Sequence, residues 1–192
     1  GDWWQAAKRY RQWATGQTWA RKGWIQDRQD VPRIMKDIGL WWLGGGTAEE
    51  ARTMMEQAEQ ACPLPIGLHW YSWHQIPFDN SYPEYFPTKP GVAEAVRELT
   101  GRGQVIMPYI NGRLWDRDIP SFAERGIPAA CKQPDGQVYI EEYGSKRKLC
   151  PMCPTTGLWQ DTMAEVCHRL ITECGVNAIY LDQIGAAAPA PC

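Results

Sequence analysis

The run from Val176 to Ile184 constrains the fold of this chain more than any other segment. It is mainly apolar as far as Leu181, and it directly follows Gly175, a residue type that often ends helices. A run of this kind is typical of a parallel strand that is buried on both faces. Asp182 stands at its carboxyl end, which is where α/β folds gather their chemistry. We therefore predict a buried strand that ends on a carboxylate.

Strand-like and helix-like segments alternate along the chain. We expect helices over 2–15 and 90–99 and from Thr47 and Thr155 onward, and strands over 38–43, 65–73, 104–110 and 176–184. Thr47 followed by Glu50 is a capping-box pattern. Such alternation indicates parallel strands joined by right-handed crossovers.

The predicted fold class is α/β, the first half of a (βα)8 TIM barrel with four parallel strands and a preceding N-terminal helix. The whole barrel usually takes about 250 residues. We assign residues 1–37 to the helix and a connector, and 38–192 to the partial barrel, strands one to four. A small open doubly wound sheet is the alternative. The barrel is favoured because the second and third loops are rich in polar and aromatic residues and no dinucleotide fingerprint follows the first strand.

Composition excludes some classes of partner. The formal net charge of -2 and the pI near 6.0 give no reason to expect nucleic acid or an anionic membrane surface. No apolar run approaches the roughly 20 residues of a membrane span. The chain opens on Gly1 inside a predicted helix, so we expect an upstream part, and the sequence assigns no cellular location. Cys150 and Cys153 form a CxxC without a second pair; we interpret it as a loop anchor and expect no metal or cofactor.

The candidate site comes from the ends of the predicted strands. Eleven Trp and eight Tyr against three Phe supply flat rings with polar handles, which suit the faces of sugars. Such a pocket fits hydrolysis of a glycosidic bond, with Asp182 as the carboxylate nucleophile. The predicted substrate contacts are Trp41, Trp42, His69, Trp73, Asp79, Asn111, Arg113, Asp116 and Gln183.

Several of these residues have simpler interpretations. Arg113 and Asp116 could form a salt bridge within their loop, and Asn111 precedes a glycine in a turn-like pair. The Gly44–Gly46 run could bind phosphate at a helix start, although a flexible turn into Thr47 is the simpler interpretation.

A retaining glycosidase also needs a second carboxyl group roughly 5–5.5 Å from the nucleophile. Asp116, Glu141 and Glu142 lie in or near the long third loop and could approach Asp182. We expect the real acid/base on a later strand beyond Cys192, which would make this chain alone catalytically incomplete.

Four segments carry a resemblance to a known group of proteins. They are His69-Trp70-Tyr71-Ser72-Trp73, the run Phe78 to Pro87, the run Pro108 to Asp116, and Tyr180-Leu181-Asp182-Gln183-Ile184. Together they resemble a group of bacterial glycoside-hydrolase-like barrels catalogued as a domain of unknown function, and more distantly the barrel of endo-alpha-N-acetylgalactosaminidases. The opening helix is similar to the junction that these proteins make between an upstream β-rich region and the barrel.

The resemblance implies that Asp182 matches the strand-four nucleophile of retaining glycosidases. His69, Asn111, Arg113 and Asp116 would then contact the sugar.

The sequence therefore predicts a glycoside hydrolase acting on an oligosaccharide or glycan, with an α or a β linkage. A non-catalytic carbohydrate-binding barrel is the first alternative. A metal-dependent hydrolase built on His69, His74 and Asp79 is the second.

Overall fold

The computed structural model describes residues 1–185 and 190, and the chain divides into two compact units, Gly1–Ile38 and Gly39–Cys192. In the first unit, helix α1 (Trp3–Ala14) starts at Asp2, whose carboxylate accepts a hydrogen bond from the Gln5 amide at 2.9 Å. Two 3₁₀ turns and helix α2 (Arg33–Asp37) follow. None of the helices in the described part of the chain combines the length and hydropathy of a membrane span.

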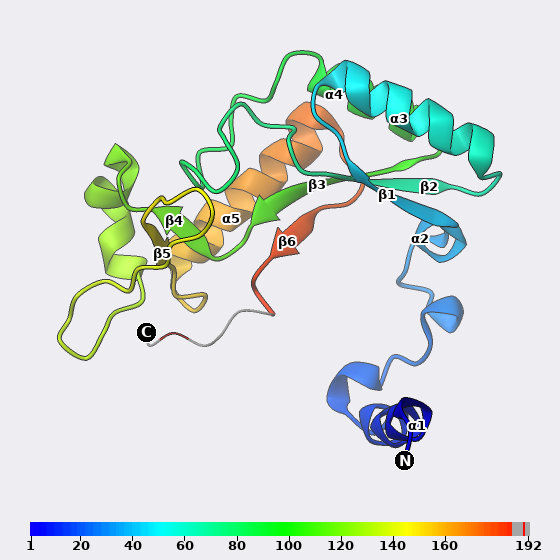
Figure 1. Cartoon of the computed structure of the whole chain (residues 1–192), viewed down its shortest axis with the longest axis horizontal. Coiled ribbons are helices and arrows are strands. Elements are labelled where there is room, and N and C mark those ends of the chain that lie inside the picture. The colour runs from blue at the N-terminus through cyan, green and yellow to red at the C-terminus, as the bar shows by residue number, and fades with distance from the viewer. Residues whose placement is uncertain (186–189, 191–192) are drawn as a thin grey trace. The chain divides into compact units, whose positions relative to one another are not determined.

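The second unit is built on a parallel sheet. Strands β1 (Leu40–Gly44), β2 (Ile66–Trp70), β3 (Val105–Asn111) and β6 (Tyr180–Asp182) pair in the order β1-β2-β3-β6, as Figure 1 shows. Each later strand joins the same edge, whereas a doubly wound sheet reverses direction partway. The sheet order therefore confirms the predicted half barrel over the open sheet.

Helices α3 (Ala48–Ala61), α4 (Val92–Gly101) and α5 (Gly157–Arg169) connect these strands, and α5 continues as a π-helical turn over residues 170–174. On one sheet face, Leu68, Trp70 and Ile106 are fully buried in the hydrophobic core. Trp70 and Ile106 line the same small space as Val92 of α4, so this face meets the helices.

Because side chains alternate between the faces of a strand, His69 and Tyr109 lie on the opposite face. We call it the inner face. The register extends it to the fourth strand, since Tyr109 pairs with Tyr180 and Asn111 with Asp182. The carboxyl ends of β3 and β6 therefore present their side chains to the same space.

The glycine run after β1 is explained by packing and capping. Gly45 has φ +82°, and a Cβ there would lie 2.4 Å from the Trp70 ring. Thr47 and Glu50 form the predicted capping box at the start of α3. The Glu50 carboxylate already accepts from the Thr47 amide at 2.7 Å. An anionic group therefore occupies this helix start, which favours the turn interpretation of the run over phosphate binding.

Strand β6 is shorter and more exposed than the sequence predicts. Only Tyr180–Asp182 form strand, and Tyr180 and Leu181 are 38% and 42% exposed. Upstream, the Asn177 side chain takes over the pairing with β3: it accepts from the Ile106 amide at 2.8 Å and donates to the Gln104 carbonyl at 2.9 Å. The expectation of a strand buried on both faces is therefore wrong.

The long segment between β3 and α5 has structure of its own. Strands β4 (Leu114–Asp116) and β5 (Leu149–Pro151) pair antiparallel, and a π-helical and a 3₁₀ turn lie between them over 122–129. Residues 137–140 form no strand, and Val138 makes only an isolated bridge to Lys132.

Candidate functional site

An aromatic cluster covers the inner face at the carboxyl ends of the strands. Tyr71 stacks on Tyr109 with ring centroids 4.9 Å apart and on His69 at 4.7 Å. Tyr180 lies 4.5 Å from the His69 ring, and Phe78 from the following loop lies 5.2 Å from Tyr109. These rings come from three strands and one loop, so the strand register brings together residues far apart in the sequence.

Asp182 lies beside this cluster at the carboxyl end of β6. Its Oδ2 accepts a hydrogen bond from the Tyr109 hydroxyl at 2.9 Å, and its carbonyl accepts from the Gly112 amide at 3.0 Å. The carboxylate is half-buried. Burial raises the pKa of Tyr109 far above its ordinary value, so the phenol keeps the proton that it donates.

Asn111 is fully buried between Tyr109 and the turn after β3. Its Oδ1 accepts from the amides of Arg113 and Leu114, each at 3.0 Å, and its Nδ2 lies 3.4 Å from the Tyr109 hydroxyl. Asn111 therefore contacts Tyr109 directly and Asp182 only through it.

Arg113 belongs to a charged cluster next to Asp182. Its guanidinium donates two hydrogen bonds to Glu141, at 2.6 and 2.8 Å, and lies 3.4 Å from Oε1 of Gln183. Tyr143 donates to the same carboxylate at 2.6 Å. Hydrogen bonding to Arg113 lowers the pKa of Glu141 although burial opposes it. Arg113 thus pairs with Glu141 and not, as the simpler interpretation had it, with Asp116.

Asp79 is held in the loop after β2. Its backbone amide donates to the Tyr82 hydroxyl at 2.9 Å, and its φ is +53°. Burial raises the pKa of the Asp79 carboxyl, its hydrogen bond with Tyr82 opposes this, and the charge of Asp182 adds to the rise. The charges of Asp79 and Asp182 therefore influence each other.

Burial also lowers the pKa of His69, while the carboxylate of Asp182 opposes the shift. The Nε2 atom of His69 is buried, and the described residues offer it no hydrogen bond. Inside the ring stack, His69 is therefore a neutral imidazole near pH 7.

Two predicted contacts, Trp73 and Trp42, have other roles. Trp73 is 1% exposed, and its indole donates to the Tyr109 carbonyl at 2.8 Å. Trp42 shares the helix-facing side of β1 and packs against the core. Both assignments to a ligand surface are corrected, because residue type alone does not reveal which face a ring occupies. Trp41, by contrast, lies on the inner face over Gly67 and is 41% exposed.

Asp116 is fully buried and fully engaged. Arg147 donates to both of its oxygens, at 2.9 and 3.1 Å, and the amides of Ser81 and Asp118 each donate at 2.9 Å. Its carboxylate joins two loops, and its assignment as a substrate contact is corrected.

His69 and His74 do not form a metal site. His74 packs against Trp73 and Tyr85, and its Nδ1 lies 2.7 Å from the Ile76 carbonyl. Within residues 1–185 and 190, no group of three or more His, Cys, Asp or Glu side chains could hold a metal ion. The proposed triad of His69, His74 and Asp79 is therefore wrong.

Four aromatic residues of the cluster are not among the predicted substrate contacts: Tyr71, Phe78, Tyr109 and Tyr180. Tyr71 and Tyr109 follow the period of two that places His69 and Asn111 on one face, and Tyr180 lies two residues before Asp182. Reading the strands by alternation would have found these three. Phe78 lies in a loop and gave no comparable signal.

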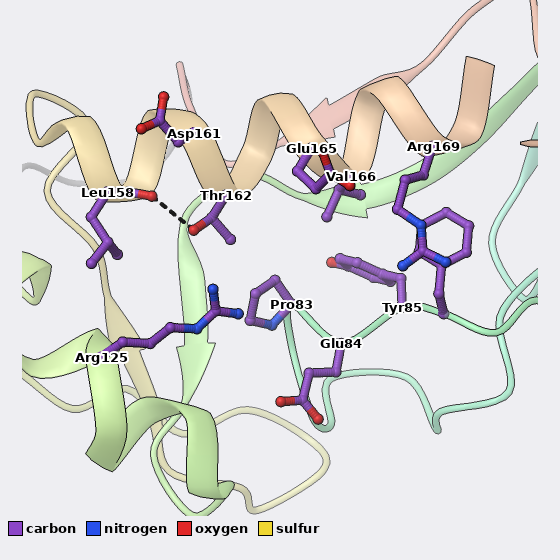
Figure 2. A pocket seen from close by; sticks show the side chains of 11 residues that line it. Pro83, Glu84, Tyr85, Arg125, Leu158, Asp161, Thr162, Glu165, Val166 and Arg169 are labelled. Carbon is purple, nitrogen blue, oxygen red and sulfur yellow. Dashed lines mark hydrogen bonds between the residues drawn. The ribbon is translucent and has the colours of Figure 1, made fainter. Parts of the chain in front are cut away.

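A groove of about 760 Å³ lies elsewhere in the unit. Figure 2 shows it between the loop carrying Pro83 and Glu84 and helix α5, which contributes Asp161 and Glu165, with Arg125 at one end. No predicted site residue lines it. The inner-face cluster around Asp182 is therefore the candidate site, because it joins the carboxylate, the rings and the strand ends.

Comparisons with known proteins agree with this architecture. The model of a family described as a domain of unknown function, DUF6259, matches residues 1–192. A protein of Bacteroides thetaiotaomicron named "Putative glycoside hydrolase" is 37% identical over 192 residues, which are 98% of this chain and 28% of that relative. The chain thus spans little more than a quarter of the relative's length.

Two solved structures are similar in fold. An alpha-N-acetylgalactosaminidase from Bifidobacterium bifidum (a quadruple mutant) matches with a TM-score of 0.68 and 16% identity, over 84% of this chain and 31% of that one. An alpha-galactosidase from Thermus thermophilus in complex with stachyose matches with a TM-score of 0.63 and 14% identity, over 80% and 34%.

Proposed function

The chain belongs to the DUF6259 family, and on this basis we propose that it supplies the nucleophile half of a retaining glycoside hydrolase. Its substrate is an oligosaccharide or glycan. Asp182 attacks the anomeric carbon, the bond to the leaving oxygen breaks as an acid protonates that oxygen, and water then hydrolyses the glycosyl ester.

The observation that carries this proposal is the setting of Asp182. Its carboxylate ends the fourth parallel strand, accepts a hydrogen bond from Tyr109, and lies beside stacked rings on the inner face. Catalytic groups of βα barrels lie at the carboxyl ends of strands. Aromatic faces next to a carboxylate suit a pyranose ring and its anomeric centre.

The other residues have supporting roles. Asp79 and Gln183 are offered as ligands of sugar hydroxyls, with Arg113 holding Gln183 and Trp41 widening the apolar wall. His69 lies against Tyr71 and Tyr180 and shapes the floor of the site.

We place the acid/base outside the described residues. Glu141 is a poor acid because Arg113 holds its pKa below the ordinary value. Asp116 is fully buried in its pair with Arg147, and Glu142 is exposed.

The substrate class follows from the structural neighbours. One is named an alpha-N-acetylgalactosaminidase and the other an alpha-galactosidase. We therefore propose α-linked galactosides and N-acetylgalactosaminides as the first substrates to test, with the β-anomers as the comparison.

Asp182→Asn in the full polypeptide tests the function. We expect hydrolysis of the reactive p-nitrophenyl α-glycosides to fall at least about 10³-fold, while sugar binding measured by calorimetry is retained. Asp161→Asn, an exposed aspartate on α5, is the matched control and should keep wild-type rates.

Azide provides a second readout. In Asp182→Ala, azide should enter the space left by the carboxylate and yield a glycosyl azide of inverted configuration, detectable by NMR. If the wild type binds sugars, cleaves no glycoside and loses no function in Asp182→Asn, the protein is a carbohydrate-binding barrel instead.

A further inference from the structure

Asn111, Tyr109 and Asp182 form a line of hydrogen bonds whose direction is set by the backbone. We propose that Tyr109 is a positioning residue for Asp182, locked as a donor by Asn111, so that Oδ2 is held and Oδ1 remains as the attacking oxygen. This inference rests on the proposed function for its catalytic consequence, but the hydrogen-bond relay itself is a separate claim.

The orientation of the Asn111 amide is fixed by its neighbours. The amides of Arg113 and Leu114 can only donate, and both lie 3.0 Å from the same side-chain atom of Asn111. That atom must be the carbonyl oxygen, so Nδ2 is the group that faces Tyr109, at 3.4 Å. The tight turn after β3 thereby determines which end of the amide meets the phenol.

The direction of the next bond follows from proton counting. An amide nitrogen only donates, so the Tyr109 oxygen accepts from Asn111. The phenol has one proton, and the Asp182 carboxylate 2.9 Å away only accepts. The relay therefore runs from Asn111 through Tyr109 to Oδ2 of Asp182.

The surroundings keep the phenol in place. Tyr109 is 2% exposed, its carbonyl accepts the Trp73 indole proton at 2.8 Å, and its ring stacks between Tyr71 and Tyr180. The described residues give Oδ1 of Asp182 no hydrogen bond. One carboxylate oxygen is thus held by a rigid donor while the other is available.

The consequence is a fixed orientation of the carboxylate. The relay holds Oδ2 on a rigid donor and so limits the rotation of the group. A nucleophile reacts faster when its attacking oxygen is held in the attacking geometry.

Tyr109→Phe in the full chain tests this directly. We expect kcat to fall about 10- to 100-fold on α-glycosides with a smaller change in KM. Tyr71→Phe is the matched comparison, because its ring stacks on Tyr109 but the described residues offer its hydroxyl no hydrogen bond; its kcat should fall less than that of Tyr109→Phe.

Asn111→Asp is the second variant. It keeps an oxygen for the two backbone amides but turns the donor toward Tyr109 into an acceptor, which competes for the phenol proton. We expect the same direction of change as in Tyr109→Phe, and little further loss in the double variant. Thermal unfolding of each variant identifies effects that come only from misfolding.

Carbon-13 NMR of chains labelled at the aspartate carboxyl carbon gives a readout without catalysis, with Asp182→Asn assigning the signal. Near neutral pH the carboxyl signal of Asp182 should change its chemical shift in Tyr109→Phe and not in Tyr71→Phe, because Tyr109 donates to this carboxylate. An unchanged signal overturns the relay. A changed signal in a protein that cleaves no glycoside supports the relay and overturns the proposed function instead.

Discussion

The two histidines near the site show how burial assigns different roles to one residue type. His69 lies in an open ring stack near a carboxylate, whereas His74 is 2% exposed and far less able to accept a proton. Burial lowers the pKa of His74 to about 4 from 6.5, against the opposing hydrogen bond to Ile76. Its Nε2 atom is buried, and the described residues provide it no partner.

His74 should make the fold sensitive to mild acid. The unfolded chain takes up a proton on this side chain as the pH falls through about 6.5, while the folded chain does so only near pH 4. The stabilisation that comes from keeping His74 neutral is therefore complete above pH 6.5. It is lost as the pH falls toward 4, which lowers the unfolding free energy by about 3 kcal/mol. Urea unfolding at pH 7 and pH 4.5 measures it.

In His74→Phe, which keeps a ring against Trp73 and Tyr85, this part of the pH dependence should disappear. His168→Phe is the control, because His168 is exposed on α5 and its removal should leave the slope unchanged. An equal slope in wild type and His74→Phe would contradict the assignment.

The sequence predicted the strand end that carries Asp182 and part of its surroundings, because a strand end is visible as an apolar run that stops at a charge. Alternation along β3 places Tyr109 on the same face as Asn111. The contact between Tyr109 and Asp182, however, depends on the register of β3 and β6, which no local pattern encodes. Trp42 and Trp73 were misplaced because an aromatic ring suits a helix interface as well as a ligand.

At the scale of the elements, local signals predicted structure well and long-range signals did not. The capping box at Thr47 and the helix expected over 90–99 depend on residues three or four apart; the capping box formed, and the helix formed as α4. The β4 and β5 pair joins segments separated by more than 30 positions, so no local sequence pattern could predict it. Likewise, Asn177 shortened β6 through bonds to β3 that only the folded chain reveals.

The pair of Asp116 and Arg147 ties these distant elements together. Asp116 on β4 is fully buried and also accepts from the Ser81 amide in the loop that carries Asp79. Arg147 lies before β5 and is 31% exposed. The carboxylate thus joins the loop after β2 to the segment before β5.

Removing Arg147 should destabilise the fold strongly. Arg147→Ala leaves a buried carboxylate with two backbone donors and no counter-charge, so we expect a loss of about 3 kcal/mol in unfolding free energy. Arg117→Ala removes an exposed arginine one residue from Asp116 and should cost less than about 0.5 kcal/mol. Chemical denaturation of both variants measures the two losses of unfolding free energy. Equal losses would mean that the pair of Asp116 and Arg147 contributes little to stability.

At the scale of the whole molecule, the main sheet has two edge strands. Within the described residues, β1 and β6 each pair with one strand of the main sheet, and all four strands are parallel. The match to the Bifidobacterium bifidum structure covers 84% of this chain and 31% of that structure.

The open edges of this sheet should make residues 1–192 associate when they are isolated. Leu43 on β1 is 63% exposed and Leu181 on β6 is 42% exposed, and unpaired edges with apolar side chains are templates for pairing. We expect light scattering after size exclusion to show concentration-dependent oligomers. Leu43→Lys and Leu181→Lys should each reduce them, because charge on an edge opposes strand pairing. Leu64→Lys is the control, since Leu64 is 54% exposed but lies in the loop before β2; if it suppresses association as well as the edge variants do, association arises from general hydrophobicity and not from the edges.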